Sequence, residues 1–405
     1  MDALITKNLR FTNGTILKPY LSQPIDYQLL ITKTAIFFNM KKRTLLLFIV
    51  VFAFNQSSIY AQNTDVFSPK YIKETMVKVT DWQMKNQIHK ETDWTNGAFF
   101  AGVFAAYETT KSPRIMDSLM AMGERNLWLP HPRFDHADDI AISQTYIDLY
   151  RIKKDRRMIQ ATLDSVLKMR KIKGNEEKKH GIAWWWCDAL FMAPPTLAKL
   201  AVTLKDPSFF VQNDSLYKQC YDLLYNKEEH LFARDAKYLW NVQGEGKKEA
   251  NGKKLFWSRG NGWVMGGLVK LLKEMPKNYP TRSFYVTLYK EMAARLLSLQ
   301  QADGLWRASL LDPASYPGGE GSGSGFDCYA MAWGINNGIL NKATYLPAVQ
   351  KTWKALNSLI TPAGKVGWVQ PIGADPRRNF NSESFEVYGA GAFLLAGSEV
   401  IKLKK

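Results

Sequence analysis

Apolar residues recur at helical spacing along almost the whole chain from residue 62 onward, and the alternation typical of strands is scarce. Six segments open with Gly, Asn, Ser, Asp or an aromatic residue and continue as apolar runs rich in small residues. They begin at Trp94, His136, Trp184, Trp257, Ser322 and Glu383. More amphipathic, lysine-rich helices are predicted between them, for example from Ser283 and from Leu346, and a first helix, SPKYIKETMVKVTDWQMK, precedes the set.

The pattern predicts an all-α fold. A helix that is apolar all round is buried on every side, and small residues let neighbouring helices approach closely. Like segments recur roughly every 40 to 70 residues, which is consistent with a repeated helix hairpin. Six buried helices alternating with six amphipathic ones predict an (α/α)6 barrel, an inner ring wrapped by an outer ring. A stacked α-solenoid is the alternative, but the unequal repeat lengths favour closure.

The polar groups of the six apolar segments stand at or near their N-terminal ends. In a closed ring these ends gather at one mouth, where the helix dipoles favour anions. Three Gly-rich or polar connections, at 173–181, 241–254 and 314–325, are expected to surround this mouth as loops. We therefore expect the functional site there.

The first 61 residues lie outside the predicted fold. Residues 1–39 are interpreted as sequence upstream of the true start, and 40–61 as a secretory signal peptide with a basic start, an apolar run and a cleavage site before Gln62. Residues 62–405 then form a single catalytic domain that is exported to the periplasm or beyond. The apolar run is short for a membrane span, so no stable span is expected after cleavage; an uncleaved anchor is the alternative.

Composition and net charge limit the classes of molecule that the protein is expected to bind. Of the formal net charge of +17, residues 1–61 contribute +5 and the remainder +12. A basic exported protein suits an acidic partner such as a polyuronate or a sulfated glycan. Nucleic acid is not expected, because no zinc-finger or RNA-binding signature is present. Thirteen tryptophans suit a large core or a sugar-binding cleft. The sequence does not specify an oligomeric state.

Three cysteines, Cys187, Cys220 and Cys328, form no disulfide framework, and neither CxxC nor HExxH occurs. We expect buried thiols, with at most one disulfide. No metal and no other cofactor is predicted.

The run WWWCDALFMAPP places one carboxylate, Asp188, among indoles and aliphatic side chains, with Met192 on the same helical face. A carboxyl in apolar surroundings has a raised pKa and stays protonated near neutral pH, as a general acid must. The alternative is that Asp188 only caps the helix that starts at Ala189.

Two further clusters accompany it. HADDIAIS supplies His136, Asp138 and Asp139, and paired carboxylates are usual in glycosidic chemistry. Either acid could instead be a helix cap.

In WSRGNGW, the flat rings of Trp257 and Trp263 could stack on a sugar ring. The planar guanidinium of Arg259 could form two hydrogen bonds with a carboxylate. The alternative is a buried tryptophan pair with the arginine bound to loop carbonyls. Arg234 and Asn96 are weaker candidates for substrate contact.

Taken together, the DD-containing helix, WWWCDALFMAPP and WSRGNGW resemble the unsaturated rhamnogalacturonyl hydrolases and unsaturated glucuronyl hydrolases of glycoside hydrolase families 105 and 88, over nearly all of 65–405. The resemblance implies an (α/α)6 barrel. It also implies a hydrolase that removes a 4,5-unsaturated uronic acid from the non-reducing end of lyase-generated oligosaccharides, by hydrating the enol-ether double bond.

For the residues, the resemblance implies Asp188 as general acid/base and Asp138 as the second carboxylate, with Asp139 as its alternative. Met192, Trp257, Arg259 and Trp263 match substrate-contacting positions. Two positions depart from the pattern: Ser143 stands where glycine is expected, and Arg234 where the rhamnogalacturonyl members carry histidine. A second cation suits a sulfated or additionally carboxylated sugar.

Two other hypotheses remain open on the residues alone. One is a different carbohydrate-active enzyme on the same ring of helices, either a polysaccharide lyase or a conventional glycosidase. The other is a glycan-binding protein without catalysis, for which aromatic walls would suffice.

Overall fold

The computed structural model describes residues 65–133, 135–171 and 181–403. Residues from Asp65 onward form one compact unit. The predicted upstream segment 1–39 and signal peptide 40–61 lie outside the described residues, as does most of the predicted loop at 173–181. Within the described residues, no helix is both long enough and apolar enough to cross a bilayer.

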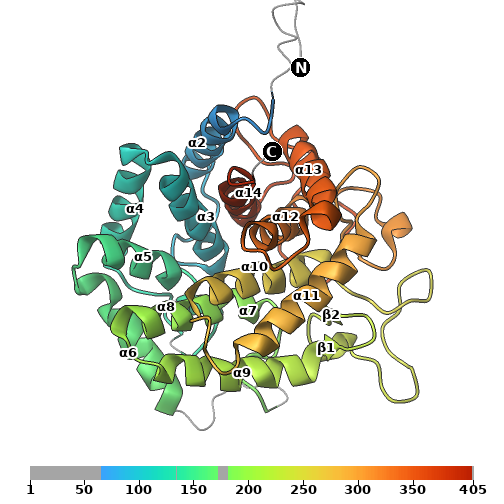
Figure 1. Ribbon diagram of the computed structural model, residues 1–405, viewed down its shortest axis with the longest axis horizontal. Helices are drawn as coiled ribbons and strands as arrows, with labels where there is room; N and C mark the ends of the chain where they lie inside the picture. The colour runs from blue at the N-terminus through green and yellow to red at the C-terminus, as the bar shows by residue number, and fades with distance from the viewer. Residues whose placement is uncertain (1–64, 134, 172–180, 404–405) are drawn as a thin grey trace, which may run out of the picture. The chain divides into compact units, whose positions relative to one another are not determined.

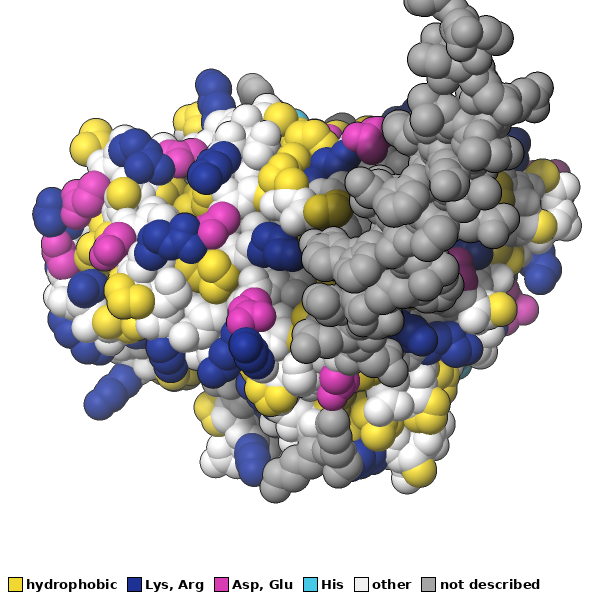
Figure 2. All heavy atoms as spheres, turned by 90° about the horizontal axis from the view of Figure 1, so that it is seen from above, with side chains coloured by type: hydrophobic (Ala, Val, Ile, Leu, Met, Phe, Trp, Pro, Cys, Tyr) yellow, Lys and Arg dark blue, Asp and Glu magenta, His cyan; other side chains and the backbone are white. Residues whose placement is uncertain are grey.

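Amphipathic helices form the outer ring of this unit (Figure 1). They contribute their apolar faces to the core and their lysines to solvent, as the sequence pattern predicts. Their bounds are α2 (Pro69–Lys85), α4 (Pro113–Arg125), α6 (Arg157–Lys171), α9 (Ser208–Leu224), α11 (Arg282–Leu299) and α13 (Lys342–Ser358). On the face seen in Figure 2, Lys and Arg side chains are scattered among acidic and apolar ones.

The inner ring is made of the helices that are buried on nearly every side. Each packs on the next around the ring, and α14 closes it by packing on α3. The (α/α)6 barrel is therefore confirmed, and the open solenoid is wrong. The inner helices are α3 (Trp94–Thr110), α5 (Ser143–Lys153), α8 (Pro194–Leu204), α10 (Ser258–Glu274), α12 (Gly321–Asn336) and α14 (Val387–Val400).

Short elements precede several inner helices at the amino-terminal end of the ring. These are η1 (Asp138–Ile140) and α7 (Ala189–Met192), followed by the strand pair β1 (Tyr225–Asn226) and β2 (Leu231–Phe232), then η2 (Ala236–Tyr238) and η3 (Pro313–Ser315). The predicted loop 314–325 is shorter than expected, because α12 already starts at Gly321. There the Glu320 carboxylate accepts hydrogen bonds from the amides of Ser322 and Gly323 and so caps the helix.

Glycines allow the inner helices to touch backbone to backbone. A methyl carbon built on Gly102 of α3 would lie 2.5 Å from the carbonyl oxygen of Gly391 on α14. One built on Gly267 of α10 would overlap the carbonyl oxygen of Leu190 on α7, the short helix before α8. Neither crossing leaves room for a side-chain carbon, so the packing requires the bare backbone at both.

All three cysteines are buried free thiols, as expected.

We predict that Gly102→Ala lowers the free energy of unfolding by about 1–3 kcal/mol, because α3 and α14 must separate to admit the methyl group. Urea denaturation followed by circular dichroism measures this. Gly373→Ala is the matched control: its nearest neighbour is the flexible end of Arg377 at 3.3 Å, and a change within about 0.5 kcal/mol is expected. Equal stability of the two variants would contradict the close crossing.

Candidate active site

Asp188 lies at the amino-terminal end of the inner ring, directly before α7. The preceding residue is held by a chain segment far along the sequence: the Cys187 amide donates to the Arg234 carbonyl at 2.9 Å, and Trp186 bridges to Asp235. Although Asp188 occupies the N-cap position of α7, its side chain makes no capping hydrogen bond. The capping alternative therefore does not describe what this carboxylate does.

The surroundings of Asp188 are not purely apolar, which corrects the expectation from WWWCDALFMAPP. The Nε atom of Arg234 lies 3.5 Å from the Asp188 carboxylate, and the Cys187 thiol donates to the same oxygen at 3.6 Å. Arg234 also donates to Asp235 at 2.7 Å, and its guanidinium lies over the Trp185 ring. A fixed cation thus stands beside Asp188, where it stabilises the carboxylate anion.

Asp138 is the carboxyl group with the displaced pKa. It starts the turn η1, and 18% of its side chain is exposed. Burial and then the negative charge of Asp188 raise the pKa of Asp138 to about 8, although Arg133 and Arg234 act in the opposite direction. Asp138 is therefore protonated at neutral pH. This raised pKa of Asp138 was not predicted from the sequence.

Asp139 is occupied by a structural ion pair. Its side chain is almost fully buried and accepts from the backbone amide of Arg133 at 2.6 Å and from its guanidinium at 2.7 Å. This contact ties the loop before η1 to the turn itself. Asp138, the other acid left open by the sequence, has a carboxylate oxygen 3.7 Å from His136 Nδ1.

The two carboxyl groups are held by a rigid framework of helices. The Thr196 hydroxyl of α8 donates to the carbonyl of Ile140 in η1 at 3.0 Å. The Gln144 amide of α5 donates to the carbonyl of Phe191 in α7 at 2.9 Å. His136 lies beside Asp138: its Nδ1 accepts from the Asp138 amide, and its ring lies 4.8 Å from that of Trp186. These contacts fix the positions of the two elements that carry Asp138 and Asp188.

The WSRGNGW cluster is buried, which corrects its expected role in direct substrate contact. Arg259 has no exposed surface, and its two terminal nitrogens donate to the carbonyls of Gln370 and Pro371 at 2.5 and 3.0 Å. Its guanidinium lies between the rings of Trp257 and Tyr388. Arg259 thus binds loop carbonyls and fixes the 370–371 loop over the end of the barrel.

Trp263 and Met192 are likewise fully buried. The Trp263 ring packs on Phe326 at 4.4 Å and on Phe191 at 4.9 Å, so it fills the barrel interior. Met192 ends α7 within the same core. Both residues support the site from below, and neither presents a surface to a sugar.

Asn96 also has a supporting role. It is fully buried in the first turn of α3, and its amide nitrogen donates to the carbonyls of His89 and Lys90 at 3.2 and 3.0 Å. It thereby fixes the loop before α3.

Three residues near the mouth were not singled out from the sequence. Trp94 begins α3, is partly exposed, and stacks on Tyr388 at 5.6 Å. His89 pairs with Glu386 at 2.7 Å. Trp94 could have been found, since like Trp184 and Trp257 it opens an inner segment; the His89–Glu386 pair joins residues 297 positions apart, so no local signal exists for it. Within the described residues, no group of three or more His, Cys, Asp or Glu side chains is arranged to hold a metal ion.

Comparison with known proteins finds relatives that match most of the chain. Residues 68–404 match Glycosyl Hydrolase Family 88. An unsaturated 3S-rhamnoglycuronyl hydrolase from Formosa agariphila is 43% identical over 380 residues, which cover 91% of this chain and all of that protein.

Two solved structures are similar along most of the chain. A glycosyl hydrolase of family 88 from Bacteroides vulgatus superposes with a TM-score of 0.76 at 29% identity, covering 83% of this chain and all of the other. A protein described as a polysaccharide lyase superposes with a TM-score of 0.76 at 32% identity, covering 82% of this chain and 97% of the other.

We predict that the Asp138 carboxyl titrates with a midpoint near 8, far above the ordinary value of about 3.9. Carbon-13 NMR of aspartate-labelled protein measures this midpoint. Asp188→Asn removes a neighbouring negative charge, so the midpoint should fall. Arg133→Gln removes an opposing positive charge, so the midpoint should rise. An ordinary midpoint, or one that neither substitution moves, would contradict the coupling.

Proposed function

The chain belongs to glycosyl hydrolase family 88, and on that premise we propose that it removes a 4,5-unsaturated uronic acid from the non-reducing end of acidic oligosaccharides. The observation that carries this proposal is the pair of acids at the barrel mouth: Asp138, protonated at neutral pH, beside Asp188, which faces Arg234. Enol-ether hydration requires one acid that gives a proton and one base that receives a proton.

The proposed reaction adds water across the double bond. One carboxyl of the pair protonates C4 of the unsaturated ring while the other carboxylate takes a proton from the water that attacks C5. The resulting hemiketal opens to a 5-keto sugar, and the hemiacetal left at C1 expels the rest of the chain. Atoms balance with one water consumed, and the pair recovers its single proton.

We assign the chemistry to the pair rather than to one member, because interacting acids titrate together. The resemblance implies Asp188 as general acid/base, whereas Asp138 is the carboxyl whose pKa is raised to about 8. Transfer of the shared proton between the two carboxyls when substrate binds reconciles both.

For the substrate, we propose an unsaturated uronic acid linked to a sulfated rhamnose. The supporting observations are the 43% identity to an unsaturated 3S-rhamnoglycuronyl hydrolase along almost the whole chain and the basic side chains near the acids. Arg234 is 19% exposed and Arg133 46% exposed, so both can face an anionic sugar. A guanidinium suits sulfate and carboxylate oxygens alike.

A polysaccharide lyase is the second candidate, favoured by the similarity to one described as such. The two activities change the ultraviolet absorbance in opposite directions. A lyase creates the conjugated double bond from an intact polymer, whereas the proposed hydrolase removes it from a short product.

We predict that the purified full chain bleaches the ultraviolet absorbance of an unsaturated uronyl–rhamnose 3-sulfate disaccharide, and acts more slowly on the desulfated form. Asp188→Asn should lower kcat by about 10²–10⁴ with little change in substrate affinity, because an amide cannot exchange the proton. Stopped-flow absorbance and calorimetric binding to the inactive variant measure both quantities.

Asp327→Asn is the matched control. Asp327 is a fully buried acid of α12 whose burial raises its pKa well above the ordinary value, so the neutral amide replaces a neutral acid, and activity within about twofold of wild type is expected. Unchanged absorbance with sulfated, pectic and glycosaminoglycan disaccharides would refute the proposed function. An absorbance increase from intact polymer would replace it with lyase activity.

We also propose export, supported by the basic start, apolar run and cleavage site at 40–61. We predict that protein recovered from the periplasm or medium of expressing bacteria begins at Gln62 by N-terminal sequencing. Protein that retains Met40 and sediments with membranes would instead indicate an uncleaved anchor.

A further inference from the structure

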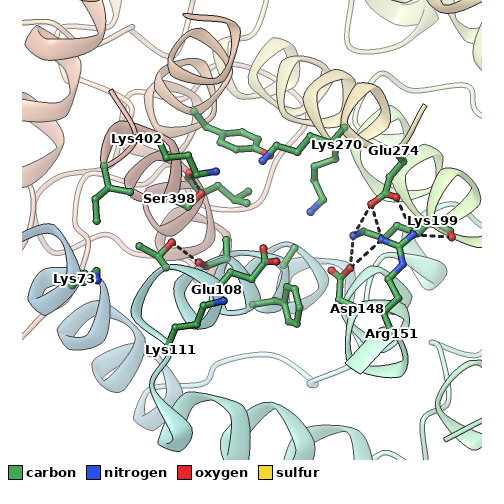
Figure 3. A pocket seen from close by; sticks show the side chains of 18 residues that line it. Lys73, Glu108, Lys111, Asp148, Arg151, Lys199, Lys270, Glu274, Ser398 and Lys402 are labelled. Atoms are coloured by element: carbon green, nitrogen blue, oxygen red, sulfur yellow. Dashed lines mark hydrogen bonds and ion pairs between the residues drawn. The ribbon is translucent and has the colours of Figure 1, made fainter. Parts of the chain in front are cut away.

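A second cavity lies at the end of the barrel opposite the two acids. It measures about 610 Å³ and is lined by the carboxyl-terminal halves of all six inner helices (Figure 3). Small-molecule sites span about 300–1,000 Å³. The aromatic core around Trp263 lies between this cavity and Asp188, so the cavity is not an extension of the candidate active site.

Cations outnumber anions around this cavity. Its walls carry one arginine and six lysines against three carboxylates, Glu108, Asp148 and Glu274. Each of the paired carboxylates is shared by more than one cation. Glu274 accepts from Arg151 at 2.9 Å and from Lys199 at 3.3 Å, and Glu399, just behind the wall, accepts from Lys273 and Lys402 at 2.6 and 2.9 Å.

Lys270 differs in its contacts from Lys199, the other buried lysine of this cavity, which is paired with Asp148 and Glu274. Only 8% of Lys270 is exposed, and its side chain projects into the cavity (Figure 3). No hydrogen bond or ion pair joins its ammonium group to any described residue. A buried lysine is ordinarily paired, because an unpaired buried ammonium is strongly destabilising.

The groups that face Lys270 come from every wall. Burial, then the nearby ammonium groups of Lys199 and Lys273, lower the pKa of Lys270 to about 7, although Asp148 and Glu274 raise it. Glu108 on α3, Tyr329 on α12 and Lys402 just past the end of α14 also line the cavity. The cavity thus places a weakly compensated cation where a ligand of negative charge would fit.

A simpler account is that the lysines only offset the negative ends of the inner helix dipoles. That account suits residues in or just past the last turns, such as Lys111, Lys273 and Lys402. It does not explain Lys270, which precedes the end of α10 by four residues and points into an open volume.

We propose that this cavity is a binding site for a small divalent oxyanion, sulfate or phosphate, with Lys270 as its central contact. Lysine ammonium groups suit such anions as point charges approaching from several sides. Lys273 and Lys402 at the rim would add to the attraction. The site is independent of the catalytic pair.

Isothermal titration calorimetry of the full chain with sodium sulfate, and separately with inorganic phosphate, tests this at ionic strength held constant with sodium chloride. We expect saturable binding of at least one divalent anion, no comparable binding of acetate, and a rise in Tm that follows anion concentration. Lys270→Met should weaken binding at least tenfold. Lys290→Met, an exposed lysine of the outer helix α11, should bind as wild type.

A second measurement needs no variant. Lys270 should react with a low dose of acetic anhydride faster than ordinary lysines at neutral pH, because more of it is unprotonated, and sulfate should slow its acetylation selectively. Peptide mass spectrometry reads this at each lysine. Equal binding by wild type and Lys270→Met, or acetylation of Lys270 that sulfate does not slow, would overturn the proposal and leave dipole compensation as the role of these lysines. Asp188→Asn should leave anion binding intact, so failure of the proposed hydrolase activity does not bear on this result.

Discussion

The fold depends on one packing constraint: six inner helices run in the same direction and close into a ring at backbone contact. Gly102 against Gly391, and Gly267 against Leu190, show how close these contacts are. Because the inner helices are parallel, all their amino termini lie at one end of the barrel and all their carboxyl termini at the other. The helix dipoles therefore make the first end positive and the second end negative. The carboxylates Asp188 and Asp235 lie at the positive end, and most of the inner-ring lysines lie at the negative end. The chemistry of each end follows from the direction of the helices.

At the amino-terminal end, two buried carboxyl groups share one electrostatic environment, so their ionisation is coupled. Arg234 lies 3.5 Å from Asp188, and the negative charge of Asp188 opposes ionisation of Asp138. Asp138 and Asp188 are chemically identical, so the difference between their electrostatic surroundings comes from their positions in the fold. Arg133 holds Asp139 in an ion pair, and its positive charge acts on Asp138 against the effects of burial and of Asp188.

Periodicity was sufficient to predict the barrel, because each inner helix is buried on all sides and each outer helix on one. The same segments located Asp138 and Asp188 at the correct end. The roles of individual side chains depended on contacts that local sequence does not contain. Arg259 was expected to face substrate, yet its partners are carbonyls of residues 370 and 371, supplied by a loop more than a hundred positions away. The raised pKa of Asp138 was not predicted, because two of the charges that act on it, Asp188 and Arg234, come from other segments of the chain. Lys270 resembles any core-edge lysine in sequence, and only the assembled ring shows that its ammonium group has no hydrogen-bond or ion-pair partner among the described residues.

The barrel interior keeps these two electrically different ends apart. Trp263, Phe191 and Phe326 are fully buried and in mutual contact, so the ring is filled with aromatic side chains and is not a channel. A sugar can therefore reach Asp138 and Asp188 only from the amino-terminal mouth, and an anion can reach Lys270 only from the opposite one. The arrangement lets both ends hold anions without direct competition for the same residues.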